Sequence, residues 1–238
     1  MKKLKKILIS VALVLALCFG GFGIYAMDYY HAEETAVNAV VSEDIQVYSQ
    51  GDMMVFEPKN PTTGFIFYPG GKVEHIAYSL LMKQLADNGI LCVIVKMPFN
   101  LAVLNINGAK EVLQQFDSVD SWYIGGHSLG GSMAASFAVE NTDVIDGLIM
   151  LAAYSTVDLK QTDLKVLSVY GDADGVLNME KYGQYYPNLP HTMTEVIING
   201  GNHAQFGSYG AQDGDGIATI SADKQIKQTV NAIIDSIK

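Results

Sequence analysis

A serine between two glycines is the most chemically suggestive feature of this 238-residue sequence. Ser128 lies in the pattern Gly126-x-Ser128-x-Gly130, after the apolar run 122–124 and before a run of small residues. A sharp turn from a strand into a helix would strain the serine backbone, so the residues two positions away must be nearly free of side chain. The helix would direct its first amides toward a developing oxyanion. The pattern therefore predicts a nucleophilic serine, although a glycine-rich turn before a helix gives the same letters.

A serine nucleophile needs a base and a carboxylate that orients the base. His203 follows the apolar run 195–198 in a glycine-rich loop and is the predicted base. The other histidines occupy a segment near the N-terminus, the start of a helix, the serine turn itself and a turn after a proline; they are His31, His75, His127 and His191. Asp172 and Asp174 both follow the run 166–170, and either could be the acid, although Asp172 could equally cap its own turn.

An oxyanion needs two backbone donors. The amide of Leu129 follows the nucleophile directly, and Gly71 lies in the loop after the apolar run 63–68. Lys72 and Glu74 lie next to Gly71, and Phe99 lies in segment 96–107, which follows another strand. We expect these three side chains to line the substrate pocket, although Lys72 and Glu74 could equally be solvated. Segment 204–221 should also shape specificity, because it is too rich in Gly and Asp to form a packed element.

Short apolar runs alternate with amphipathic runs along the chain. This alternation is typical of an α/β fold with a mostly parallel sheet covered by helices on both faces. The runs 45–48 and 53–57 flank a turn and predict a leading antiparallel hairpin. Further strands are expected at 63–68, 90–95, 122–124, 147–151, 166–170 and 195–198, and helices at 28–41, 76–88, 107–116, 132–140, 179–186 and 222–237.

Four motifs together resemble the α/β-hydrolase superfamily, close to its dienelactone-hydrolase-like and small carboxylesterase-like members. They are the runs 65–71, 126–131, 171–175 and 200–203, within residues 45–238. The resemblance implies an α/β-hydrolase fold without a large cap domain, hydrolysis of an ester-like bond through a Ser-His-Asp triad, and no cofactor. It selects Asp174 as the acid, because the family turn reads Gly-x-x-Asp. Dienelactone hydrolases carry cysteine where this chain has Ser128, which favours a carboxylesterase-like activity instead.

Residues 1–27 predict a signal peptide or an N-terminal membrane anchor. Four lysines precede an apolar run at 7–24, just long enough to span a bilayer, and tyrosines follow it. The residues before Met27 make a poor cleavage site, so we favour an anchor with an exported body over a secreted protein. Residues 28–44 would form a juxtamembrane helical segment, and residues 45–238 the hydrolase domain.

The charge of the chain excludes some partners. Its formal net charge is −10, and all 15 basic residues are lysine. Residues 28–238 hold 11 lysines against 25 acids, which argues against nucleic acid as a partner. The run 213–216 holds two aspartates but lacks the spacing of a calcium loop, so we expect an acidic surface turn and no metal site. Cys18 and Cys92 are not expected to pair.

The expected partner is a small ester-like molecule, with a membrane as a second partner if residues 1–27 are retained. Two other functions remain open at this point. The chain could be a catalytically idle surface protein on the same fold, or it could transfer its acyl group to an acceptor other than water. Oligomeric state and acyl chain length do not follow from the sequence.

Overall fold

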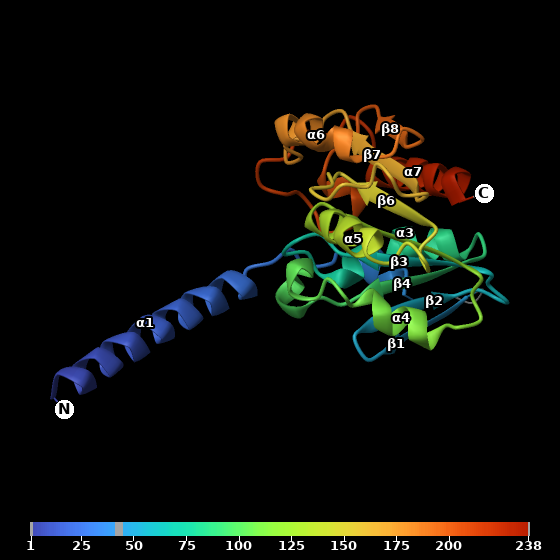
Figure 1. Ribbon diagram of the computed structural model, residues 1–238. Helices are drawn as coiled ribbons and strands as arrows, with labels where there is room; N and C mark the ends of the chain where they lie inside the picture. Colours follow the sequence, from blue (N-terminus) through green and yellow to red (C-terminus); the bar gives the residue numbers. More distant parts are fainter. Residues whose placement is uncertain (1, 41–44, 238) are drawn as a thin grey trace.

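The computed structural model describes residues 2–40 and 45–237. Its body is built on one eight-stranded sheet with the strand order β1-β2-β4-β3-β5-β6-β7-β8 (Figure 1). The strands are β1 (Gln46–Gln50), β2 (Met53–Glu57), β3 (Thr63–Tyr68), β4 (Ile90–Val95), β5 (Ser121–His127), β6 (Gly147–Leu151), β7 (Lys165–Gly171) and β8 (Thr194–Ile198). This order confirms the predicted fold class.

The sheet is parallel from β4 to β8, and only its first strands run antiparallel. β1 pairs with β2 as a hairpin, and β2 pairs antiparallel with β4. Side chains alternate between the two faces, as the pleat requires. Phe65 and Phe67 of β3 point into one apolar core, whereas Ile66 and Tyr68 point into the other. Because both faces are buried, most residues of the central strands are apolar, and β4 is apolar throughout.

Helices cover the two faces separately. On one face α3 (Ser79–Ala86) and α7 (Ala222–Ile237) pack on the core that contains Phe65. On the other face α4 (Ala109–Gln115) and α5 (Leu129–Val139) pack on the core that contains Ile66. The small side chains of α5 let it lie close to the sheet beside β5. Helix α6 (Met179–Tyr185) follows β7. Short 3₁₀ turns, η1 to η5, occupy 75–78, 98–100, 102–104, 186–188 and 204–206.

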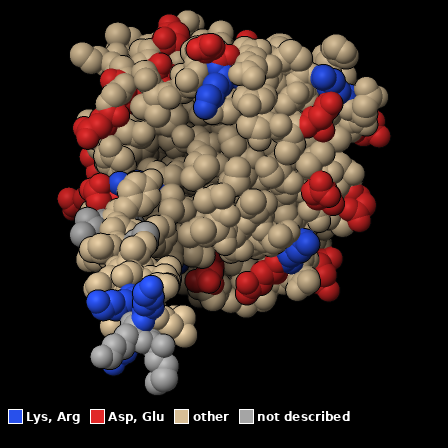
Figure 2. Space-filling view, turned by 60° about the vertical axis from the view of Figure 1, so that its left-hand side comes forward, with Lys and Arg blue, Asp and Glu red and all other residues tan. Residues whose placement is uncertain are grey.

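The first helix, α1 (Lys2–Met27), projects from the body (Figure 1). Figure 2 shows it coming forward from one face, with lysines at its far end. Its residues Lys3–Gly23 are long and apolar enough to cross a membrane. A signal sequence near an N-terminus has the same length and composition, so this helix is compatible with an anchor and with a signal peptide.

Residues 28–33 are extended, not helical as predicted. Helix α2 is confined to Glu34–Asn38, and residues 41–44 lie outside the described residues. The reason is a backbone pairing with a distant segment, which the local sequence pattern does not reveal. The Tyr30 amide donates to the Lys72 carbonyl at 2.8 Å, and the Glu74 amide donates to the Tyr30 carbonyl at 2.9 Å. This segment therefore forms a parallel bridge with the loop after β3.

Candidate active site

Ser128 occupies a strained turn between β5 and α5. Its backbone angles are φ +53° and ψ −120°, in a region that non-glycine residues rarely adopt. A Cβ at Gly130 would overlap the carbonyl oxygen of Tyr68, and a Cβ at Gly126 would lie 2.5 Å from that same oxygen. Both glycines are therefore needed for α5 to pack against the end of β3, as the spacing of the motif predicted.

His203 and Asp174 form a buried pair. The His203 Nδ1 lies 2.9 Å from Asp174 Oδ2, and each side chain is only 1% exposed. The other Asp174 oxygen accepts from the amides of Val176 at 2.8 Å and Leu177 at 2.7 Å. Asp172 instead accepts from the Gly200 amide at 2.6 Å and is exposed. Of the two aspartates left open by spacing, Asp174 is the one beside His203.

Ser128 and His203 line the same cavity, which has a volume of about 250 Å³. The His203 Nε2 is buried and has no hydrogen-bond partner among the described residues. Since Nδ1 faces Asp174, Nε2 is the nitrogen left to exchange a proton with a group in this cavity. The other lining residues are Leu129, Ser132, Ala152, Ala153, Tyr154, Val176, Leu177 and Asn178. Sequence analysis missed Tyr154 and the run 176–178, which carry no local motif.

The two residues predicted to supply the oxyanion donors, Leu129 and Gly71, are neighbours in the structure. Leu129 is the first residue of α5, so its amide has no partner within the helix. A Cβ at Gly71 would lie 3.1 Å from the Leu129 side chain, so the loop after β3 reaches the turn at Ser128. The Tyr78 hydroxyl accepts from the Gly70 amide at 3.0 Å. This bond fixes the loop immediately before Gly71.

Three side chains predicted to line the pocket lie elsewhere. The Lys72 Nζ pairs with Asp28 at 2.7 Å, and Glu74 accepts from the Ala32 amide at 2.9 Å. The Phe99 ring packs edge-on against Phe22 of α1, at a centroid distance of 5.2 Å. Lys72, Glu74 and Phe99 therefore contact the N-terminal part of the chain and do not line the cavity beside Ser128. The sequence does not indicate these contacts, because they join segments that are far apart in the chain.

His127 lies buried behind the site. Its ring stands 4.4 Å from the His203 ring, centroid to centroid, and its Nδ1 lies 2.8 Å from the Tyr78 hydroxyl. Because Gly70 donates to that hydroxyl, the Tyr78 proton is free to be donated to His127. Burial, reinforced by the neighbouring His203, lowers the pKa of His127 well below its usual value. A neutral His127 thus lies between the Tyr78 hydroxyl, which contacts Gly70, and the His203 ring, a position that the sequence did not indicate.

Asp215 ties the acid and base loops together. Its carboxylate accepts from the backbone amides of Gly175, His203, Ala204 and Gly216 at 2.8 to 3.2 Å. The prediction of an acidic surface turn is therefore wrong for Asp215, whose carboxylate satisfies backbone donors on two other loops. Segment 204–221 also packs more closely than expected, because Phe206 and Tyr209 are buried. Among the described residues, no cluster of three or more His, Cys, Asp or Glu side chains could hold a metal ion.

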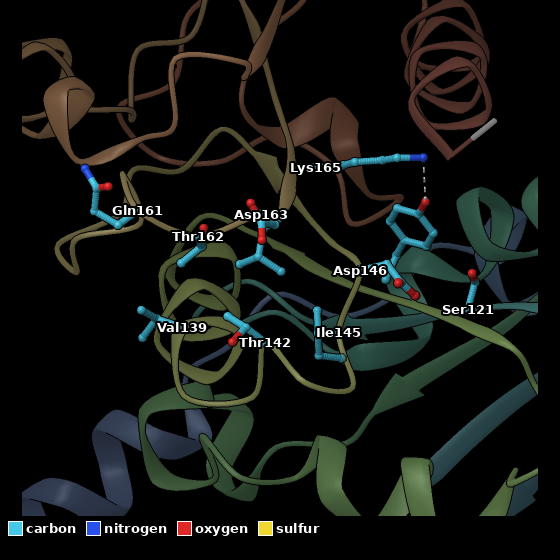
Figure 3. A pocket seen from close by; sticks show the side chains of 11 residues that line it. Ser121, Val139, Thr142, Ile145, Asp146, Gln161, Thr162, Asp163 and Lys165 are labelled. Carbon is cyan, nitrogen blue, oxygen red and sulfur yellow. Dashed lines mark hydrogen bonds between the residues drawn. The ribbon is translucent and has the colours of Figure 1, made fainter.

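A larger cavity, of about 440 Å³, lies at the opposite end of the strands, where β5 and β7 begin. Ser121 and Lys165, the first residues of β5 and β7, are among its lining residues (Figure 3). Lys165 reaches the Tyr123 hydroxyl at 3.4 Å, and Asp146 accepts from the Trp122 amide. These polar groups are already engaged in the fold. The cavity holds no pairing of a nucleophile with a base, so we place the chemistry at the smaller cavity.

The sequence matches the profile of the alpha/beta hydrolase family over residues 64–227, and the chain belongs to that family. Solved structures share its fold. They include a predicted CIB-like hydrolase from Thermoplasma acidophilum (15% identity, TM-score 0.58, covering 80% of this chain and 97% of that one). Dienelactone hydrolase from Anabaena variabilis is 11% identical, with a TM-score of 0.61 and coverage of 81% and 99%. Est1E from Butyrivibrio proteoclasticus, solved with ferulic acid bound, is 15% identical, with a TM-score of 0.60 and coverage of 83% and 98%.

The comparison with curated proteins finds no match. The resemblance to dienelactone hydrolases and esterases stated from the motifs is confirmed by the family match and by these structures.

Replacing Asp215 with alanine should destabilise the protein. Four backbone donors would lose their acceptor, and a buried donor left unsatisfied costs about 1–3 kcal/mol. Because water can reach part of this loop, we expect the free energy of unfolding to fall by about 2–4 kcal/mol in total. Chemical denaturation of the full chain in detergent measures the loss. Asp213→Ala is the matched control, since the Asp213 residue is exposed; an equal loss in both variants would contradict the proposed role of Asp215.

His127 should make stability depend on pH. The unfolded chain takes up a proton at this residue below a pH of about 6.5, whereas the folded chain resists it. The unfolded state then binds more protons, so the free energy of unfolding should fall by about 1 kcal/mol between pH 7 and pH 5.5. Denaturation curves at both pH values should show a smaller fall for His127→Gln than for the parent. His191→Gln, at an exposed histidine, should keep the parental fall; equal falls in all three proteins would refute the assignment.

Proposed function

We propose that the protein is a serine hydrolase that cleaves a carboxylic ester through an acyl-enzyme. One observation carries the proposal: the strained Ser128 and the His203 of the Asp174–His203 pair line one cavity, and the His203 Nε2 has no hydrogen-bond partner among the described residues. The membership of the chain in the alpha/beta hydrolase family supports the same reaction class.

The proposed reaction uses each group in a defined role. The His203 Nε2 removes the Ser128 proton while Ser128 Oγ attacks the ester carbonyl. Asp174 holds the proton on His203 Nδ1 and stabilises the imidazolium. The amides of Leu129 and Gly71 donate to the oxyanion of the tetrahedral intermediate. His203 then returns the proton to the leaving alcohol, an acyl-enzyme remains on Ser128, and water activated by His203 hydrolyses it.

The cavity indicates a small substrate group next to the nucleophile. Its volume of about 250 Å³ lies below the range of about 300–1,000 Å³ for sites that enclose drug-sized ligands. Leu129, Val176 and Leu177 make part of its wall apolar, while Tyr154 and Asn178 add polar groups. These features support an ester of a short acyl group. The structure of Est1E, in which ferulic acid is bound, supports an ester-cleaving role for this fold but shares only 15% identity.

We also propose that residues 1–27 remain as an anchor in the cytoplasmic membrane, with the hydrolase domain outside the cytoplasm. The apolar span Lys3–Gly23 supports the anchor. Lys2, Lys3, Lys5 and Lys6 lie at its N-terminal end, and lysines on this side favour an N-terminus in the cytoplasm. In this arrangement residues 28–33 join the anchor directly to the loop after β3.

Replacing Ser128 with alanine should abolish covalent labelling by a fluorophosphonate probe and lower kcat for ester hydrolysis by about a thousandfold or more, because the nucleophile is lost. Gel fluorescence and p-nitrophenyl ester turnover measure the two effects. Ser132→Ala is the matched control, because Ser132 lines the same cavity and its hydroxyl donates to the Tyr154 carbonyl. Ser132→Ala should still be labelled. Labelling of Ser128→Ala equal to the parent would refute the assignment.

A series of p-nitrophenyl esters should show a preference for short acyl groups. Acetate and butyrate fit a cavity of this size, whereas a palmitoyl chain would have to leave it. We expect kcat/KM to decrease from butyrate to palmitate. A folded protein that turns over no ester of the series would instead favour the idle binding protein.

A further inference from the structure

A group of exposed apolar side chains lies on the segment between β4 and α4. Phe99 is 56% exposed, and Val103 and Leu104 are each 50% exposed. We call these three residues the apolar patch. Phe99 is also held with a positive φ of 53° in the 3₁₀ turn 98–100, a conformation that is costly for a large side chain. The backbone thus keeps this ring on the surface at a cost, although burial would ordinarily be favourable.

The apolar patch adjoins the C-terminal end of α1. The Phe99 ring contacts Phe22, and Phe22 lies inside the apolar span Lys3–Gly23. A side chain that touches Phe22 must lie at the same depth as Phe22. If α1 spans a bilayer, Phe99 therefore lies at the boundary between the acyl chains and the headgroups.

The distribution of charged residues around the apolar patch agrees with a position at the boundary between acyl chains and headgroups. Residues 97–109 contain no charged side chain, although the chain carries a formal charge of −10. Figure 2 shows that the face from which α1 emerges is largely uncharged in its middle, with acidic side chains toward its rim. Tyr25 lies three residues after Phe22, and the centroid of its ring is 4.5 Å from the Lys72 Nζ. Tyrosine and lysine at the end of a span are typical of the headgroup level.

The apolar patch also borders the candidate active site. The Asn100 carbonyl accepts from the Lys72 amide at 2.8 Å, next to the predicted oxyanion donor Gly71. The 3₁₀ turn 102–104 packs against α5, the helix that begins after Ser128. The cavity and the apolar patch therefore lie at the same end of the strands, where β4 and β5 end.

We propose that Phe99, Val103 and Leu104 dock on the outer surface of the bilayer that holds α1, and that this contact turns the edge with Ser128 toward the membrane. The inference rests on the proposed retention of α1. A lipid surface explains why exposed apolar side chains, an uncharged segment and the end of an apolar helix coincide. Insertion of such side chains at the interface is favourable, because it removes apolar area from water.

Tryptophan reporters in the full chain test the docking. The parent has a single tryptophan, Trp122, which is buried in the body and gives the baseline emission. Leu13→Trp reports on the middle of α1, Phe99→Trp reports on the apolar patch, and Val144→Trp reports on an exposed apolar position before β6. Each variant is reconstituted into phosphatidylcholine vesicles that contain acyl-chain-brominated lipid, and the loss of emission is compared with unbrominated vesicles. Val103→Trp replaces Phe99→Trp if the latter does not fold.

Docking predicts that bromolipid quenches Leu13→Trp and Phe99→Trp and leaves Val144→Trp at the baseline. Quenching of Leu13→Trp alone would overturn the docking while leaving the anchor in place. In that case, access of aqueous iodide to Phe99→Trp would indicate an exposed patch, and protection from iodide would indicate a protein partner. Absence of quenching at Leu13→Trp would overturn both the anchor and the docking. Ester hydrolysis by the parent tests the proposed reaction separately, because none of these readouts uses catalysis.

Discussion

The close approach of α5 to the end of β3 is the constraint on which the site depends. It exists because Gly126 and Gly130 carry no side chain where the Tyr68 carbonyl lies, and because the Ser128 backbone accepts a strained reversal. Parallel pairing of β3 with β5 then brings the loop with Gly71 beside Leu129. A larger residue at either glycine would separate the helix from the loop, so Ser128, Leu129 and Gly71 keep their relative positions only together.

The loops that carry Asp174 and His203 are held mainly by hydrogen bonds from backbone amides to carboxylates. Asp174 accepts two hydrogen bonds from amides of its own turn. Asp215 accepts four, from amides of the loops around Asp174 and His203 and of the next residue, Gly216. Each of these hydrogen bonds satisfies a backbone N–H group that would otherwise have no partner. The loops therefore keep their geometry without regular secondary structure. The neutral His127 fills the space behind His203.

Local spacing explains what could be predicted. The motif around Ser128 is confined to five residues, and an aspartate-containing turn and a histidine-containing loop follow β7 and β8, so the fold and these candidate residues could be inferred. Spacing leaves Asp172 and Asp174 open, and the resemblance to α/β-hydrolases selects Asp174. The role of Asp215 could not be inferred, because three of its four partners lie 11 to 40 positions away. The sequence predicts residues 28–33 to be helical together with the Glu-, Ala- and Val-containing run that follows them, but they pair with the loop after β3 instead. The same pairing draws Lys72 and Glu74 away from the cavity.

The bridge between Tyr30 and Val73 limits how far the body can move from its attachment. Only six residues lie between the end of the apolar span at Gly23 and Tyr30, and the seven residue steps from Gly23 to Tyr30 reach about 25 Å even in a fully extended chain. If α1 is retained as the proposed anchor, the body can reach only a thin layer of fluid above the lipid and not the bulk medium. Its encounters would then be governed by what is displayed in that layer, and lateral diffusion in two dimensions would replace free diffusion in the supply of substrate.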